Sequence, residues 1–178
     1  DDGRLRVNGR TTTTAGLWRE LGADGEFAVW IVQELLANHP GMTAIGGSET
    51  LHTARITTLV GRDGPPRILF ANLKLAISGG AVDNFQAGAT GNAIVEIDDE
   101  GRLGAVYTTN PWPAGLQRGA DNPLTGESLT GRSLPGWDDA RRMVLDAAPH
   151  FLPYRALGWD VALTPGGPVI VETNTRWL

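Results

Sequence analysis

The sequence predicts an α+β domain with a mostly antiparallel sheet and flanking helices. Several strand-length apolar runs are separated by turns rich in Gly, Pro and Asp, a pattern typical of β-hairpins. Helical spacing of apolar residues appears in only two segments, one near the N-terminus and one late in the chain. The chain then closes on another hairpin. This order, a small N-terminal piece, strands, a helix and a hairpin, indicates the α+β class.

The first 36 residues predict a strand, a helix and a second strand. Residues 5–7 alternate in polarity and end at an Asn-Gly turn signal. The threonines at 11–14 offer a helix N-cap, and apolar residues at 17, 18 and 21 predict a short amphipathic helix closed by Gly22. Residues 27–36 predict a strand that runs into a loop.

The middle of the chain predicts two hairpins. Strands are expected over 51–60 and 67–77, joined by the Gly-Pro-rich turn at 61–66. A second pair is expected over 92–97 and 103–108, joined by an acidic turn that ends at Gly101. Residues 110–135 are rich in Pro, Gly, Asn and Thr and predict a long loop, which often carries function. An amphipathic helix is expected over 139–150, with Pro149 and Pro153 marking its end.

The closing hairpin is expected to centre on Gly166, within a Thr-Pro-Gly-Gly-Pro turn. That register places Val161 opposite Val171 and Leu163 opposite Val169.

The same register gives the closing hairpin a candidate metal site. It places Asp160 opposite Glu172, with Asn174 on the face of Glu172 because side chains alternate along a strand. Like charges at opposed positions destabilise a strand pair, so we expect a positive group between the two carboxylates. The three candidate ligands are hard oxygens, which favour Mg²⁺ or Mn²⁺. An ordinary hairpin with exposed acidic residues is the alternative.

Composition narrows the function classes. The 178 residues are 41% hydrophobic and 20% charged, as expected of a globular domain. The net charge of −5 argues against a general nucleic-acid binder. The absence of Cys excludes disulfides, thiolate metal sites and Cys nucleophiles. The longest apolar run, 27–32, is too short to span a membrane, and no signal peptide opens the chain, so we expect a cytoplasmic protein.

The closing segment GWDVALTPGGPVIVETNTRW resembles the metal-binding tail of the ATP-grasp ligases. It is especially similar to the sugar-transfer-associated ATP-grasp proteins and the related α-L-glutamate-ligase-like group. The resemblance implies that Asp160, Glu172 and Asn174 hold Mg²⁺ (or Mn²⁺) against the phosphates of ATP.

Two further segments resemble those parts of ATP-grasp proteins that contact the nucleotide and the transferred phosphoryl group. VWIVQELL resembles the hinge strand that reads adenine, which implies nucleotide-binding positions at Gln33, Glu34 and Leu36; a core strand with a polar end is the alternative. Arg55, in a strand, would meet the γ-phosphate and the acyl-phosphate formed from it, for which a planar guanidinium is suited. A surface or salt-bridged Arg is the alternative. His52, three residues before Arg55 in the same predicted strand, has no His, Cys or Ser partner nearby in the sequence and is expected to be an ordinary strand residue.

The segment GGAVDNFQAGA resembles the "DNF…GG" stretch that crosses the active site in this group, except that Ala89 replaces the second Gly of the usual pair. The resemblance implies that Asn84 binds phosphate or substrate and that Asp83 orients Arg55 or Lys74. Lys74, the single lysine of the chain, could itself reach a phosphate. The alternatives are a Gly-rich turn with an Asx cap and a solvated strand lysine.

The resemblance also implies a domain division. Residues 1–28 are expected to be a remnant of the N-terminal ATP-grasp subdomain, and 29–178 its C-terminal subdomain. The chain does not open with Met, and no lysine-bearing, Gly-rich phosphate loop precedes Arg4, so we expect an incomplete nucleotide clamp with a missing upstream subdomain.

The leading functional hypothesis is an ATP- and Mg²⁺-dependent carboxylate ligase-like domain that acts through an acyl-phosphate. Its partners would be a small-molecule carboxylate and a nucleophile, with neither nucleic acid nor a membrane span involved. One alternative is a non-catalytic nucleotide- or ligand-binding module. Another is a metal-dependent glycan-processing domain that uses Asp160 and Glu172 as paired carboxylates.

Overall fold

The computed structural model describes residues 3–7, 9–27, 29–80, 83–109 and 115–176. It divides into two compact units, the N-terminal unit Asp1–Leu35 and the sheet unit Leu36–Leu178. Each is described by itself. The predicted α+β class is confirmed, because a seven-stranded antiparallel sheet is combined with α-helices. No helix of the described residues combines the length and the apolar character needed to cross a membrane.

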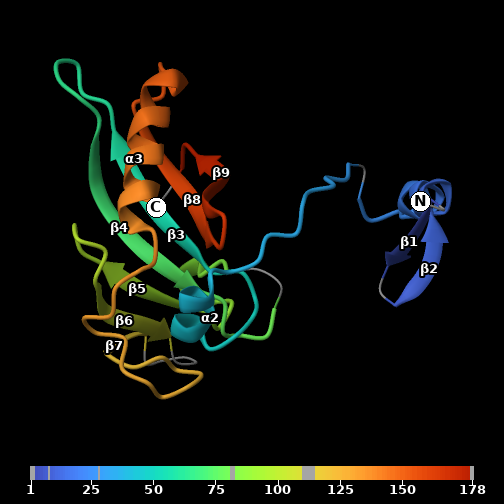
Figure 1. Cartoon of the computed structure of the whole chain (residues 1–178), viewed down its shortest axis with the longest axis horizontal. Coiled ribbons are helices and arrows are strands. Elements are labelled where there is room, and N and C mark those ends of the chain that lie inside the picture. The colour runs from blue at the N-terminus through green and yellow to red at the C-terminus, as the bar shows by residue number, and fades with distance from the viewer. Residues whose placement is uncertain (1–2, 8, 28, 81–82, 110–114, 177–178) are drawn as a thin grey trace. The chain divides into compact units, whose positions relative to one another are not determined.

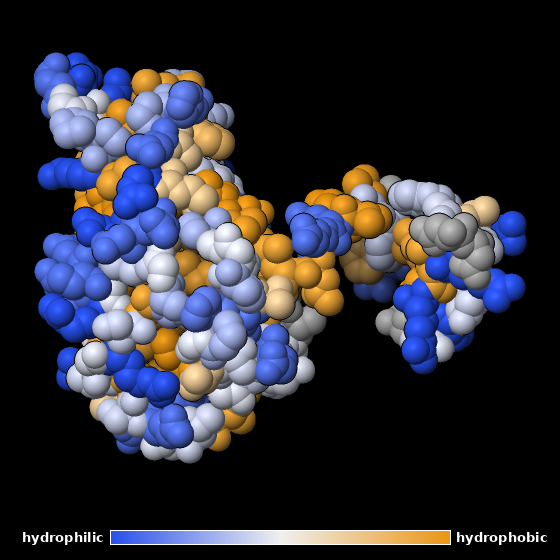
Figure 2. Space-filling view, viewed as in Figure 1, coloured by the Kyte–Doolittle hydropathy of each residue, from blue (hydrophilic) through white to orange (hydrophobic). Residues whose placement is uncertain are grey.

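The N-terminal unit is a short hairpin followed by a helix. Strands β1 (Arg4–Val7) and β2 (Arg10–Thr13) pair antiparallel, and α1 spans Thr14–Ala23. The helix starts where the sequence predicts, because the Thr13 hydroxyl accepts a hydrogen bond from the Gly16 N–H at 3.1 Å. The strand expected over 27–36 is wrong for the described residues, which pair with no neighbouring strand. Figure 2 shows hydrophobic residues gathered along this segment.

The sheet unit is built on seven antiparallel strands in the order β7-β6-β5-β4-β3-β8-β9 (Figure 1). The two hairpins predicted from the middle of the chain are present at the sheet centre. The strands are β3 (Thr53–Leu59), β4 (Arg67–Leu75), β5 (Ala93–Ile97), β6 (Leu103–Thr109), β7 (Leu116–Gly119), β8 (Ala156–Thr164) and β9 (Gly167–Asn174). Strand β7 lies within the segment expected to be a loop, and its pairing with the edge of β6 explains the difference.

Helices cover one face of this sheet and enclose the core. α2 spans Pro40–Gly46, and α3 spans Trp137–Ala147 and lies along β3, β4, β8 and β9 (Figure 1). α3 is followed by the 3₁₀ turns of Ala148–Phe151, so the predicted helix ends three residues early, where Pro149 removes an N–H donor. Trp159 is fully buried, packs edge-on against Phe151 and donates to the Thr58 hydroxyl at 2.8 Å.

The closing hairpin corrects the predicted register near its turn. Thr164 pairs with Gly167, so the loop has two residues, Pro165 and Gly166, one fewer than expected. The expected Val161–Val171 and Leu163–Val169 pairs are therefore wrong; Val161 lies opposite Ile170 and Leu163 opposite Pro168. A bulge between the Asp160 and Val161 pairs adds one residue to β9. Beyond it, Asp160 lies opposite Glu172, as predicted.

Candidate functional site

A row of polar residues crosses the sheet on the face opposite the core. Glu172, Asp160, Arg55, Asn72 and Glu96 lie opposite one another in succession on β9, β8, β3, β4 and β5. Directly opposed residues of antiparallel strands share a face, so the five belong to one surface of the sheet. The next position along each strand faces the buried core, as shown by Ile56, Leu73, Val95, Trp159 and Val161. Strand alternation thus separates a polar face from an apolar one.

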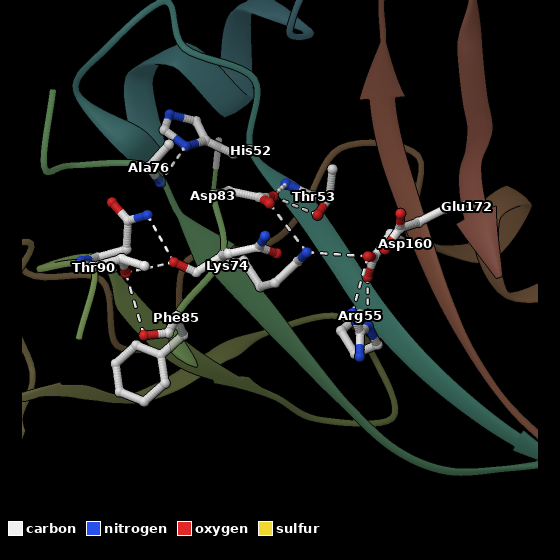
Figure 3. Close-up of polar contacts among 12 residues, drawn as sticks. His52, Thr53, Arg55, Lys74, Ala76, Asp83, Phe85, Thr90, Asp160 and Glu172 are labelled. Atoms are coloured by element: carbon white, nitrogen blue, oxygen red, sulfur yellow. Dashed lines mark hydrogen bonds and ion pairs between the residues drawn. The ribbon is translucent and has the colours of Figure 1, made fainter. Parts of the chain in front are cut away.

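Four charged side chains at the centre of this face form what we call the charge cluster: Arg55, Lys74, Asp83 and Asp160 (Figure 3). Arg55 donates to both oxygens of Asp160, from Nε to Oδ1 and from Nη2 to Oδ2, the latter at 2.9 Å. Lys74 Nζ lies 3.1 Å from Asp160 Oδ2 and 3.0 Å from Asp83 Oδ1. The side chains are only 3–17% exposed, so water screens these charges weakly.

Arg55 and Asp160 favour each other's charged forms. Burial by itself would raise the pKa of Asp160, but the hydrogen bond from Arg55 and the positive charge of Lys74 outweigh it and hold that pKa below its ordinary value. The hydrogen bond to Asp160 raises the pKa of Arg55. Arg55 and Lys74 thus place positive charge beside Asp160, on the side of β8 away from Glu172. The positive group expected between Asp160 and Glu172 stays a prediction.

The three candidate metal ligands share one face and one end of the polar row. Glu172 is exposed opposite Asp160, and Asn174 Nδ2 donates to Glu172 Oε1 at 3.0 Å. Among the described residues, no group of three or more His, Cys, Asp or Glu side chains is arranged to hold a metal ion. A third ligand beside the two carboxylates would have to be the Asn174 amide oxygen. Two carboxylates and one amide form an all-oxygen donor set, which fits Mg²⁺ or Mn²⁺.

Beside Arg55 the structure has a cleft of about 320 Å³, lined mostly by residues of β4, β5 and the segment between them and also by Arg176, two residues after β9. Arg55 and Lys74 form one end, and Phe85 and Ile94 contribute apolar walls. None of the described lining residues is a carboxylate, in contrast to the β8–β9 side. The remaining lining residues are Asn72, Asn84, Gln86, Ala87 and Arg176.

Asn84 reaches the cleft on a segment we call the strap, residues 83–92 between β4 and β5. Its backbone carbonyl accepts hydrogen bonds from the Thr90 hydroxyl and, at 2.9 Å, from Asn92 Nδ2. Gln86 and Ala87 have φ of 47° and 53°, an unfavourable backbone conformation for residues with a Cβ. Such strain is characteristic of functional sites, and here it lies in the wall of the cleft.

The structure brings together most of the residues singled out from the sequence. Arg55, Lys74, Asn84, Asp160, Glu172 and Asn174 all belong to the polar face or the cleft. Gln33 and Glu34 lie in the N-terminal unit and Leu36 begins the sheet unit, so their part in nucleotide binding stays a prediction.

Sequence analysis missed Thr53, Asn72 and Glu96, although the alternation around Arg55 could have identified Thr53. The Thr53 N–H donates to Asp83 Oδ2 at 2.9 Å, and its hydroxyl donates to the same oxygen. His52, expected to be an ordinary strand residue, is fully buried. Its Nδ1 accepts from the Ala76 N–H at 3.1 Å, and burial lowers its pKa, so it is neutral.

Comparison with known proteins identifies a family. The family described as sugar-transfer associated ATP-grasp matches residues 11–178. No curated protein and no solved structure gives a significant match. A family match over nearly the whole chain, together with the predicted α+β fold, identifies the chain: it belongs to the sugar-transfer associated ATP-grasp family.

Proposed function

We propose that the polar face activates a carboxylate at the expense of ATP. A carboxylate oxygen of the substrate attacks the γ-phosphorus of ATP, the bond from that phosphorus to the β–γ bridging oxygen breaks, and ADP leaves. An amine or another nucleophile then attacks the carbonyl carbon of the acyl-phosphate, and inorganic phosphate leaves. Membership of the ATP-grasp family supports ATP-dependent, ligase-like chemistry in general. The acyl-phosphate route is our proposal.

The observation that carries this proposal is the position of Arg55 between two chemically different regions. On one side lie Asp160, Glu172 and Asn174, whose oxygens suit a divalent cation and its nucleotide. On the other side lies the cleft, which among its described residues has cationic, amide and apolar linings but no carboxylate. In this arrangement, a phosphoryl group transferred from the nucleotide to the substrate acid would pass beside the Arg55 guanidinium.

The chain's own cations stabilise the transferred group. Arg55 has five N–H donors, and two of them bind Asp160, which fixes the guanidinium plane. A guanidinium held in this way offers its other N–H groups to phosphoryl oxygens without reorganisation. Lys74 Nζ, at the end of the cleft, adds a second positive charge. Asn84 contributes an amide that can orient the substrate acid.

The divalent cation would be held by Asp160, Glu172 and Asn174. When bound, it neutralises phosphate charge and orients the nucleotide for in-line transfer. The protein keeps the two carboxylates at opposed positions of the neighbouring strands β8 and β9, and Arg55 holds the Asp160 carboxylate in place.

Glu172→Gln tests this function in the protein that carries the chain at its natural length. We expect loss of Mg²⁺-dependent ATP turnover, because the substitution removes a charge that would bridge the cation. The fold should be retained, with thermal stability without metal equal to or above wild type, because Glu172 is exposed and lies opposite Asp160. Glu100→Gln, on an exposed turn, is the matched control.

Each outcome of this experiment is informative. Wild-type turnover in Glu172→Gln would remove Glu172 from the site, and unfolding would show that its role is structural. A wild-type protein that binds ATP with Mg²⁺ but turns over none with any acid would instead be a nucleotide-binding module.

A further inference from the structure

Asp83 is buried at the start of the strap, and its carboxylate touches both neighbouring strands. Oδ1 lies 3.0 Å from Lys74 Nζ on β4, and Oδ2 accepts from the Thr53 N–H and hydroxyl on β3 (Figure 3). Thr53 is two residues before Arg55, so it shares the polar face. Asp83 is not among the candidate ligands for the cation, yet it contacts the lysine that contacts Asp160.

Lys74 is therefore shared between two carboxylates at nearly equal distances, 3.0 Å to Asp83 and 3.1 Å to Asp160. Asp160 already receives two hydrogen bonds from Arg55. If Asp83 were neutral, two cations would face Asp160 with no other buried carboxylate in the cluster. A carboxylate surrounded in this way has a weakened attraction for a divalent ion, because like charges disfavour one another at short range.

The charge balance depends on the same residue. The cluster has two cations and two carboxylates, and Glu172, opposite Asp160, adds a further carboxylate. Neutralising Asp83 would remove one negative charge from this group without touching a proposed ligand.

The strap holds Asp83 in place from its other end. The Asn92 carboxamide oxygen accepts from the Ile77 and Ser78 N–H groups at 3.0 and 3.1 Å, and its Nδ2 binds the Asn84 carbonyl. Asn92 is 1% exposed, so these bonds are shielded from water. Since the strap is fixed by these bonds, the Asp83 carboxylate keeps its place, and Lys74 Nζ stays at nearly equal distances from Asp83 and Asp160.

We propose that Asp83 is a positioning residue that shares the Lys74 ammonium with Asp160 and thereby sets the affinity of the Asp160–Glu172 pair for a divalent cation. This inference rests on the proposed function, since it requires the cation site. It assigns Asp83 an effect on metal binding although Asp83 does not itself bind the metal.

The experiment is a titration of Mn²⁺ into the natural-length protein, alone and with a non-hydrolysable ATP analogue, with free Mn²⁺ measured by electron paramagnetic resonance. Asp83→Asn should weaken Mn²⁺ binding by about 10–100-fold, the range typical of residues that support metal ligands. The carboxamide oxygen that this substitution introduces can still accept from Thr53, so melting curves should show a folded protein. Asp98→Asn, the same charge change on the exposed β5–β6 turn, should leave the affinity within about twofold, because that carboxylate is solvated and remote in the sheet.

A double variant separates positioning from a merely structural role. In Asp83→Asn/Lys74→Met the lysine that would crowd Asp160 is gone, so Mn²⁺ affinity measured without nucleotide should return to within about threefold of wild type. If Asp83 mattered only for the fold, removing Lys74 as well would weaken binding further. The rescue also applies if the single variant fails to fold, since the double variant removes the buried cation that has lost one of its two carboxylate partners.

The outcomes distinguish this inference from the function on which it rests. A wild-type protein that binds no Mn²⁺ in either condition rejects the proposed cation site itself. Wild-type binding that Asp83→Asn leaves within about twofold overturns the role of Asp83, as does a double variant at least tenfold weaker than wild type.

Discussion

Two groups of ion pairs in the sheet unit use the same chemistry in different surroundings. In the charge cluster, Arg55 binds Asp160, and their side chains are 17% and 3% exposed. On the β5–β6 turn, Arg102 binds Asp98 and Glu100, and these side chains are 44–62% exposed. Both place a guanidinium about 3 Å from carboxylate oxygens. The two groups therefore differ in burial and not in contact distance.

The physical reason lies in solvation. On the turn, water and salt screen each charge whether or not its partner is present, so the pair contributes little. In the cluster, each charge has lost its water, and its partner is its main source of compensation. A buried cluster of this kind stabilises the fold only while it is complete. Because water screens its charges weakly, the cluster would also interact strongly with a bound phosphate or cation.

Asp160→Asn should have the largest effect on the free energy of unfolding. It leaves Arg55 without its carboxylate and Lys74 with Asp83 alone, so we expect a loss of about 3 kcal/mol, the lower end of the range for a broken buried pair because Arg55 is partly exposed. Urea denaturation at neutral pH measures it. If Asp160→Asn changed the free energy of unfolding as little as Asp98→Asn on the β5–β6 turn, burial would not distinguish the two groups of ion pairs.

His52 extends the comparison to pH. Burial lowers its pKa, against the opposing effects of a hydrogen bond at Ser48 and the charge of Asp83, so the unfolded chain binds a proton more readily than the folded one. Stability should therefore fall as pH decreases from about 6.5 toward the lowered value, by at most about 1.4 kcal/mol per pH unit. His52→Asn keeps an acceptor for the Ala76 N–H and should flatten this slope.

The control for His52 is His150→Asn, at an exposed position after α3. It should leave the pH dependence of stability as in the wild type. Equal flattening by both substitutions would show that burial of His52 is not the cause of the slope.

Asp98→Asn should have the smallest effect. The Asp98 carboxylate accepts hydrogen bonds from the backbone N–H groups of Glu100 and Arg102 and from Arg102 Nε. On this exposed turn, water can take over these bonds when Asp98 is neutralised. We expect an unchanged melting temperature by circular dichroism. A clear drop would show that the turn depends on its charges, and the contrast with the cluster would be lost.

The parts of the fold that depend on local sequence could be predicted. The Thr13 cap, the α3 periodicity and the Asp160–Glu172 pairing each depend on residues fewer than fifteen positions apart. The register near the turn could not be predicted. A two-residue loop with a bulge places Asp160 opposite Glu172, and a three-residue loop without a bulge would do the same.

Long-range contacts could not be predicted from the sequence. Arg55 and Asp160 are 105 positions apart, and only the placement of β8 next to β3 brings them into contact. The apolar run at 27–36 has strand-like composition, but a strand needs a partner, and the described chain supplies none there. Lys74 stands out in the sequence as the single lysine, yet its position between two carboxylates depends on the strap, which local patterns do not fix.

The central claim is that the polar face of the sheet binds a nucleotide together with a divalent cation. Calorimetric titration of ATP into the natural-length protein, with Mg²⁺ and then with the chelator EDTA, tests it most directly. We predict saturable binding of ATP that weakens at least tenfold when Mg²⁺ is removed. In the Glu172→Gln variant, the affinity for ATP should be nearly independent of Mg²⁺. Binding that is equal with and without Mg²⁺, or no ATP binding at all, would contradict the account.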